Sequence, residues 1–141
     1  MNPRNTFYLS GYFGNDRSTN SFETDRVWGN RNASLRWNHL FGSRIFANFS
    51  AIFSQYNYKV TQPREAASFV GQSRIEDYQL KSDWGFVINN DHELNFGASI
   101  IAHKLKPGER IPFNEDSSSD TLILDQEIGL ENAAYISHEA T

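Results

Sequence analysis

The sequence predicts an all-β fold of about six antiparallel strands that follow one another in up-and-down order. Three observations lead to this prediction. Apolar residues alternate with small or polar ones at a period of two, which indicates strands with one apolar face. No segment has a convincing helical period. The segments that connect the alternating runs are short and long in strict turn.

The first three alternating runs lie at 6–13, 32–38 and 45–54. In each run, one parity holds apolar or small residues, and the other holds mostly hydroxyl, amide or charged side chains. Successive side chains of a strand point to opposite faces, so each run predicts a strand with one apolar face. The apolar parity contains Phe7, Leu9, Gly11, Phe13, Ala33, Leu35, Trp37, Ile45, Ala47, Phe49, Ala51 and Phe53.

The last three runs lie at 77–88, 93–103 and about 124–138, and the alternation is weakest in the last of them. The polar parity of the first two of these runs holds Asp77, Gln79, Lys81, Asp83, Gly85, Glu93, Asn95, Gly97, Ser99 and His103. A water-exposed face would usually carry more Lys and Glu than Asn, Ser and Gly, which favours the lumen of a barrel. The apolar parity of the first two contains Tyr78, Leu80, Trp84, Phe86, Ile88, Leu94, Phe96, Ala98, Ile100 and Ala102.

The connections fall into two length classes. "LFGSR" and "NNDH" are of hairpin length and contain turn-forming residues. "NDRSTNSFETDRVWG", "KVTQPREAASFVGQSR" and "KPGERIPFNEDSSSD" each run to about fifteen residues. In an up-and-down sheet this order places every short turn at one edge and every long loop at the other. Transmembrane β-barrels follow that rule, with short periplasmic turns and long extracellular loops.

The run lengths agree with a membrane barrel, since a tilted membrane strand needs about 9 to 11 residues. Six strands do not close a barrel, because bacterial single-chain barrels begin at eight. Open edges in lipid would leave backbone groups unpaired. We therefore expect residues 1–141 to form one part of a larger transmembrane β-barrel.

Composition argues against several functional classes. The net charge is −4 at pH 7 and no basic stripe is present, so we expect no nucleic-acid partner. Cysteine is absent, which excludes disulfides and thiolate metal sites. No run approaches the roughly eighteen apolar residues of a transmembrane helix. Without a recognisable nucleophile and base, phosphate loop or paired carboxylates, we predict neither an enzyme nor a cofactor.

Histidines and acidic residues do not form a recognisable metal site. The four histidines fall on separate strands or turns, and no carboxylate–histidine spacing supports a ligand set. The acidic stretch "NEDSSSD" lacks the pattern of a calcium loop, and we expect a mobile surface loop there. The histidines are His39, His92, His103 and His138.

The two parities predict two surfaces. We expect the apolar parity to face lipid and the polar parity to line a barrel lumen; the alternative for the polar parity is a solvated face of a soluble protein. The predicted lipid-facing residues are Leu35, Trp37, Phe49, Phe53, Trp84, Phe86, Leu94 and Phe96. The predicted lumen-facing residues are Arg36, Asp77, Lys81, Asp83, Glu93 and Asn95.

Aromatic residues lie near both ends of the predicted strands. Trp37 and Trp84 are near the short turns, where we expect an inner aromatic girdle at headgroup depth, with ordinary sheet packing as the alternative. Trp28, Tyr56 and Tyr58 are near the long loops and are candidates for an outer girdle.

Two segments carry a resemblance to a known family. "WGNRNASLRWNHLFGSRIFANFSAIFSQYNYKV" and "NNDHELNFGASIIAHKLKPG" resemble consecutive barrel segments of TonB-dependent outer-membrane receptors of the Bacteroidota type. "ENAAYISHEAT" is similar to the strand that follows. The resemblance spans about residues 3–139. It implies a barrel of about twenty-two strands filled by a plug domain, with import driven through the TonB complex. The plug, the TonB-contacting segment and the remaining strands would lie outside these residues.

The function that we expect is uptake of a nutrient such as a siderophore, a glycan or a peptide across the outer membrane. The alternative is a soluble β-sheet module whose apolar face packs as a core and whose loops bind a glycan or protein. A third possibility is a barrel with a structural or adhesive role. The candidates for first contact with the solute are the loop residues Arg64, Phe69, Arg74, Arg110 and Phe113.

Overall fold

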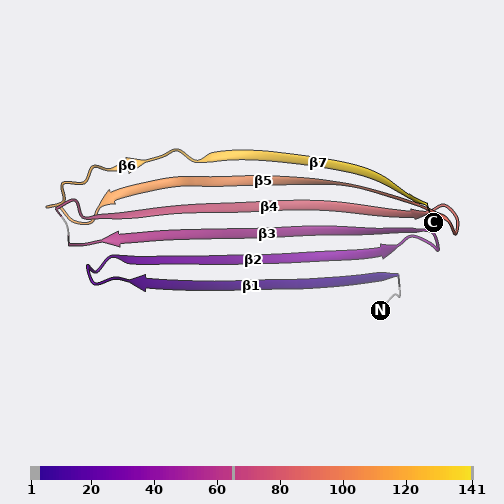
Figure 1. Ribbon diagram of the computed structural model, residues 1–141, viewed down its shortest axis with the longest axis horizontal. Helices are drawn as coiled ribbons and strands as arrows, with labels where there is room; N and C mark the ends of the chain where they lie inside the picture. The colour runs from indigo at the N-terminus through magenta and orange to yellow at the C-terminus, as the bar shows by residue number, and fades with distance from the viewer. Residues whose placement is uncertain (1–3, 65, 141) are drawn as a thin grey trace.

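The computed structural model describes residues 4–64 and 66–140, and these form one antiparallel sheet without helices. Each of β1 to β4 pairs with the next strand along the chain, and β5 pairs with both β6 and β7 (Figure 1). The predicted all-β, up-and-down architecture is confirmed. The strands are β1 (Asn5–Thr19), β2 (Asp25–Leu40), β3 (Ile45–Gln62), β4 (Phe69–Val87), β5 (His92–Pro112), β6 (Leu122–Ile123) and β7 (Glu127–Ala140).

β6 and β7 occupy consecutive parts of the same edge of β5. The two residues of β6 pair with Glu109 and Arg110, while β7 pairs with the stretch from 92 to 105. β7 stands where the weak alternation at 124–138 predicted a sixth strand, and β6 lies just before that run. The break at 124–126 lies beside a β-bulge, where the register of β4 and β5 shifts between Gln72 and Arg74.

The strands β1 to β5 are longer than their predicted runs, so the predicted extent of the long connections is wrong. Only residues 20–24 separate β1 from β2, and only 63–68 separate β3 from β4. Beyond the predicted runs, polar and charged side chains take over the apolar parity, while aromatic side chains such as Tyr56 and Tyr58 lie on the opposite face. The alternation in hydrophobicity therefore ends, whereas the backbone pairing continues, for example between Arg17 and Val27.

The placement of the connections follows the prediction. The short turns at 41–44 and 88–91 lie at one end of the sheet, and the other connections lie at the opposite end (Figure 1). The turn at 20–24 is held by Asn20, whose Oδ1 accepts hydrogen bonds from the backbone N–H groups of Phe22 (3.1 Å) and Thr24 (2.9 Å).

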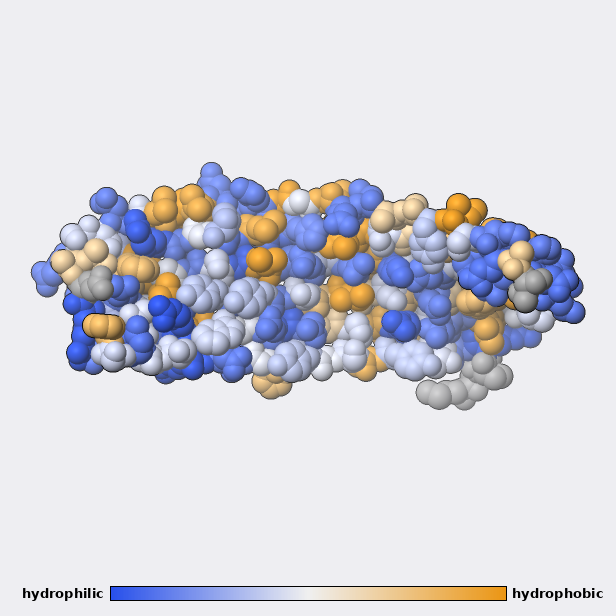
Figure 2. Space-filling model, in the orientation of Figure 1, coloured by the Kyte–Doolittle hydropathy of each residue, from blue (hydrophilic) through white to orange (hydrophobic). Residues whose placement is uncertain are grey.

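The sheet has almost no hydrophobic core of its own. Its accessible surface is 10119 Å², whereas a compact monomer of this mass exposes about 7,500 Å². Ala47, 1 % exposed, is the one buried hydrophobic residue among the residues that the structure describes. Hydrophobic residues reach the surface in the middle of the sheet as well as at its edges (Figure 2). Exposed apolar surface of this kind marks an interaction site.

Candidate functional site

Residues paired directly opposite each other across the strands form rows that share one face of the sheet. We call the face that carries Phe49 the apolar face. Phe49 lies opposite Trp37 on β2 and opposite Ser82 on β4, and the row continues to Ala98 and Ala134. The register places all the residues predicted to face lipid on this one face: Leu35, Trp37, Phe49, Phe53, Trp84, Phe86, Leu94 and Phe96.

The apolar face carries no formal charge over much of its height. In the rows that cross β3 from Ile45 to Phe53, no described residue on this face is Asp, Glu, Lys or Arg. We call this region the apolar band; it spans 45–53 on β3, 78–86 on β4 and 94–102 on β5. Small residues in the band, including Ala33, Ala51 and Ala102, line a groove of about 570 Å³.

Polar atoms within the band find partners in the band itself. The indole N–H of Trp84 donates to Ser82 Oγ over 2.7 Å. The indole N–H of Trp37 donates to Asn5 Oδ1 over 3.0 Å, and His39 Nδ1 lies 2.7 Å from the same oxygen. These bonds satisfy groups that would otherwise be costly in apolar surroundings.

Aromatic rings form a continuous series across the band near the short turns. Ring centroids lie 6.0 Å apart for Phe7 and Trp37, and 5.2 Å apart for Trp37 and Phe49. The series continues from Phe49 to Trp84 at 5.5 Å, and from Trp84 to Phe96 at 6.1 Å. These separations are favourable for aromatic pairs. The structure thus brings together Trp37 and Trp84, the two residues predicted for an inner girdle.

The outer girdle prediction is wrong for its three residues. Trp28 lies opposite Tyr58, and Tyr56 lies opposite Asn30 and Ile75. All of these belong to the parity opposite to that of Trp37 and Phe49. Trp28, Tyr56 and Tyr58 therefore lie on the other side of the sheet, because the intervening strands have continuous register.

The opposite side of the sheet, the polar face, carries all six residues predicted to line a lumen. His103 Nδ1 lies 2.8 Å from Asp77 Oδ1, and the phenol of Tyr135 donates a hydrogen bond to Asp83 Oδ1 over 2.9 Å. Lys81 Nζ lies 3.0 Å from Asp83 Oδ2. These contacts lie within β4, between β4 and β5, and from β7 across β5 to β4. The six residues are Arg36, Asp77, Lys81, Asp83, Glu93 and Asn95.

Charged residues return on the apolar face directly beyond the band, towards β6. We call this region the polar collar, and it occupies the rows that cross β3 at Gln55, Asn57 and Lys59. It contains six cationic side chains and two carboxylates. The cations are Arg17, Arg31, Lys59, Arg74, Lys104 and Lys106, and the carboxylates are Glu76 and Glu109.

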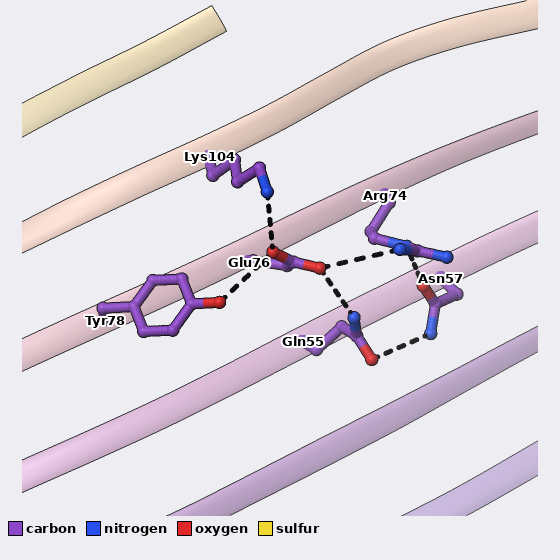
Figure 3. Close-up of polar contacts among 6 residues, drawn as sticks. All are labelled: Gln55, Asn57, Arg74, Glu76, Tyr78 and Lys104. Carbon is purple, nitrogen blue, oxygen red and sulfur yellow. Dashed lines mark hydrogen bonds and ion pairs between the residues drawn. The ribbon is translucent and has the colours of Figure 1, made fainter. Parts of the chain in front are cut away.

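Glu76 lies at the centre of the collar network in Figure 3 and is only 8 % exposed. Its Oε1 accepts a hydrogen bond from Gln55 Nε2 over 2.8 Å, and its Oε2 accepts one from the Tyr78 hydroxyl over 3.3 Å. Arg74 Nη1 and Lys104 Nζ each lie 3.7 Å from a carboxylate oxygen. The hydrogen bond from Gln55, with the nearby cations, holds the pKa of Glu76 below its ordinary value.

A groove of about 520 Å³ opens beside this network. Its wall on the sheet includes Lys59, Arg74 and Lys106, and the segment 123–126 forms the facing wall. The groove therefore combines cationic side chains with the carboxylates of Glu109 and Asp125 and with the apolar side chains of Ile123 and Leu124. The sequence does not predict this site, because the collar residues fall in segments expected to be loops or continue a parity that is apolar elsewhere in the strand.

The predicted solute-contacting residues do not form one loop site. Phe69, Arg74 and Arg110 are strand residues, so their prediction as loop residues is wrong. The Arg110 guanidinium carbon lies 5.9 Å from the centre of the Phe69 ring. Arg64 forms an ion pair with Glu23 of the neighbouring turn. Phe113 is exposed, and its backbone N–H donates to the carbonyl of Ser68 over 3.1 Å.

Histidines do not gather into a ligand set. His92 and His138 stack with ring centroids 5.0 Å apart. Across residues 4–64 and 66–140, no group of three or more His, Asp or Glu side chains is arranged to hold a metal ion. The same residues contain no helix long and apolar enough to cross a membrane.

Comparison with known proteins gives no family: no family model, no curated protein and no solved structure matches this chain. The resemblance to TonB-dependent receptors stays a prediction that rests on the quoted segments alone.

Proposed function

We propose that this chain is a segment of an outer-membrane β-barrel, in which the apolar band faces lipid and the polar face lines the lumen. The apolar band is the observation that carries the proposal. It is a continuous uncharged surface that crosses all the long strands and gives way to charged rows at the collar. Water-exposed sheet faces have no reason to exclude charge in this way, whereas a lipid-facing surface must.

The height of the band supports the same proposal. From Ile45 to Phe53 the strand extends about 27 Å, at about 3.4 Å per residue. A tilt of about 40° reduces this to about 21 Å, close to the apolar belt of about 25 Å in outer-membrane barrels. Further strands would pair with the open edges of β1 and β7, since unpaired backbone groups are costly in lipid.

Within this barrel, we propose nutrient uptake of the TonB-dependent type, for which the resemblance of the quoted segments is the support. A plug domain and the contact with the TonB complex would come from outside residues 1–141. The solute would be a siderophore, a glycan or a peptide. The ends of the strands beyond the collar, with Phe69 and Arg110 in contact, are the surface that it would meet first.

Membrane residence is tested by fractionating cells that express the protein from its whole reading frame. We expect the protein in the outer-membrane fraction after an alkaline carbonate wash, with release only by detergent. Recovery as a detergent-free soluble monomer would contradict the proposal and favour the soluble ligand-binding module.

Transport is tested separately by deleting the gene and measuring growth on a panel of ferric siderophores, glycans and peptides as limiting nutrients. We expect one class of nutrient to fail in the deletion strain, and its uptake in the parent strain to stop when a proton uncoupler is added. Unchanged growth on every class would contradict uptake and leave the barrel a structural or adhesive role.

A further inference from the structure

We propose that the polar collar and the groove in the apolar band together bind a phosphorylated lipid. The proposal rests on the proposed membrane function, and it names the lipid leaflet at the collar end as the source of the ligand. The phosphate group would lie among the collar cations, and an acyl chain would lie along the apolar band.

The charges on the apolar face differ between the two ends of the band. At the collar end, six cations face two carboxylates across three rows. At the other end the short turns carry one charge of each sign, Arg44 and Asp91. An anionic lipid surface attracts cations that lie within a Debye length of it. The asymmetry therefore favours anionic headgroups at one end only.

Three of the collar cations remain available to a ligand. Within the described part of the chain, Arg31, Lys59 and Lys106 form no ion pair, and all three are exposed. Arg74 and Lys104, in contrast, already lie beside Glu76. Arg and Lys are the side chains that bind phosphate oxygens most strongly.

Two grooves on the apolar face match the two parts of such a lipid. The groove of about 520 Å³ is lined by three cations, Lys59, Arg74 and Lys106, and two carboxylates, Glu109 and Asp125, and its cationic wall would take the headgroup. The groove of about 570 Å³ in the band is lined by apolar residues around Ala33 and Ala51 and would take an acyl chain. Only the row of Gln55, Glu76 and Lys104 lies between them (Figure 3).

The test uses the protein, expressed from its whole reading frame, in phosphatidylcholine vesicles that contain a spin-labelled lipid. Lipid in contact with the protein gives a motionally restricted spectral component. The size of this component is compared between spin-labelled phosphatidic acid and spin-labelled phosphatidylcholine, and the ratio gives their relative affinity. We expect a preference for phosphatidic acid. The triple variant Arg31→Gln, Lys59→Gln, Lys106→Gln should reduce it at least about fivefold, the effect of one cation near an anionic surface.

The matched control removes three cations from the polar face, Arg26→Gln, Arg36→Gln and Lys81→Gln. This variant should keep the preference. Equal restricted components for both lipids would overturn the lipid site but leave the membrane barrel standing. The absence of any restricted component would refute the barrel itself. An unchanged preference in the collar variant, or a preference abolished by excess inorganic phosphate, would also overturn the assignment.

Discussion

The apolar band and the polar collar lie on the same strands and the same face, yet their chemistry is opposite. On β3 the side chains change from Phe53 to Gln55, and on β4 from Tyr78 to Glu76, while the backbone pairing continues unchanged. The backbone hydrogen bonds continue without interruption across the boundary between band and collar. Under the proposed membrane function, the medium outside the sheet, rather than the sheet's own packing, would select the residues of each region.

The largest effect is expected when a charge is placed in the band. Leu80 is 61 % exposed, so Leu80→Arg would be almost neutral in water. In lipid, an arginine near the midplane costs about 2–4 kcal/mol. We expect Leu80→Arg to lower the free energy of urea unfolding in vesicles by that amount. Gln79→Arg, on the polar face of the same strand, is the control and should change little; equal effects of the two variants would remove the distinction between the faces.

A substitution on the polar face, level with the apolar band, should have an intermediate effect on the free energy of unfolding. The Phe46 ring lies over Gly85, and a Cβ at Gly85 would be 2.0 Å from Phe46 Cζ. Gly85→Ala must displace the ring, and overpacking of this kind costs about 1–3 kcal/mol. The unfolding free energy in vesicles measures this cost.

Gly42→Ala is the matched control for that substitution. Gly42 lies in the turn at 41–44, a Cβ there would contact nothing within 4 Å, and its φ is not positive. We expect a change of less than about 0.5 kcal/mol. If Gly85→Ala were as mild as Gly42→Ala, the ring would not be packed on the glycine.

The smallest change in unfolding free energy is expected for a substitution in the collar. Glu76→Gln removes a carboxylate that accepts hydrogen bonds from Gln55 and Tyr78, and we expect a loss of about 1 kcal/mol. Glu109→Gln makes the same chemical change on the same face, where the described residues offer Glu109 no hydrogen bond. A larger loss for Glu109→Gln would show that the network does not stabilise the collar.

The pH dependence of stability follows from the lowered pKa of Glu76. A carboxylate with a pKa lowered on folding stabilises the folded state fully above its unfolded pKa, near the ordinary value of 4.5. That contribution is lost as pH falls through the lower, folded pKa. We expect the unfolding free energy to fall below about pH 4.5 and to fall less steeply in Glu76→Gln. Identical pH profiles for the parent protein and Glu76→Gln would show that ionised Glu76 does not stabilise the fold.

Much of the sheet could be predicted because the alternation in 45–54 reports directly on which face is apolar. The outer parts of the strands could not, since polar and charged residues such as Arg17 take over the apolar parity there, while aromatic residues such as Tyr58 lie on the opposite face. The outer girdle was mispredicted for a simpler reason. Trp28 and Trp37 are separated by an odd number of positions, so one continuous strand must place them on opposite faces.

The collar could not be predicted from neighbouring residues in the sequence. Gln55, Glu76 and Lys104 come from three strands, and only the register brings them together. A signal was nevertheless present. Each of these residues occupies the next position of the apolar parity on its own strand but has a polar side chain. All three lie at the same distance from the short turns.

Spin-label accessibility along β3 shows directly whether the apolar band faces lipid. Because this segment contains no cysteine, single cysteines can be introduced one at a time from Ala47 to Asn57. In vesicles, we predict that labels at Phe49, Ala51 and Phe53 collide with oxygen and not with a water-soluble nickel complex. Labels at Gln55 and Asn57 should meet the nickel complex. Nickel accessibility at Ala51, or protection of Ala51 from both reagents, would contradict a lipid-facing band.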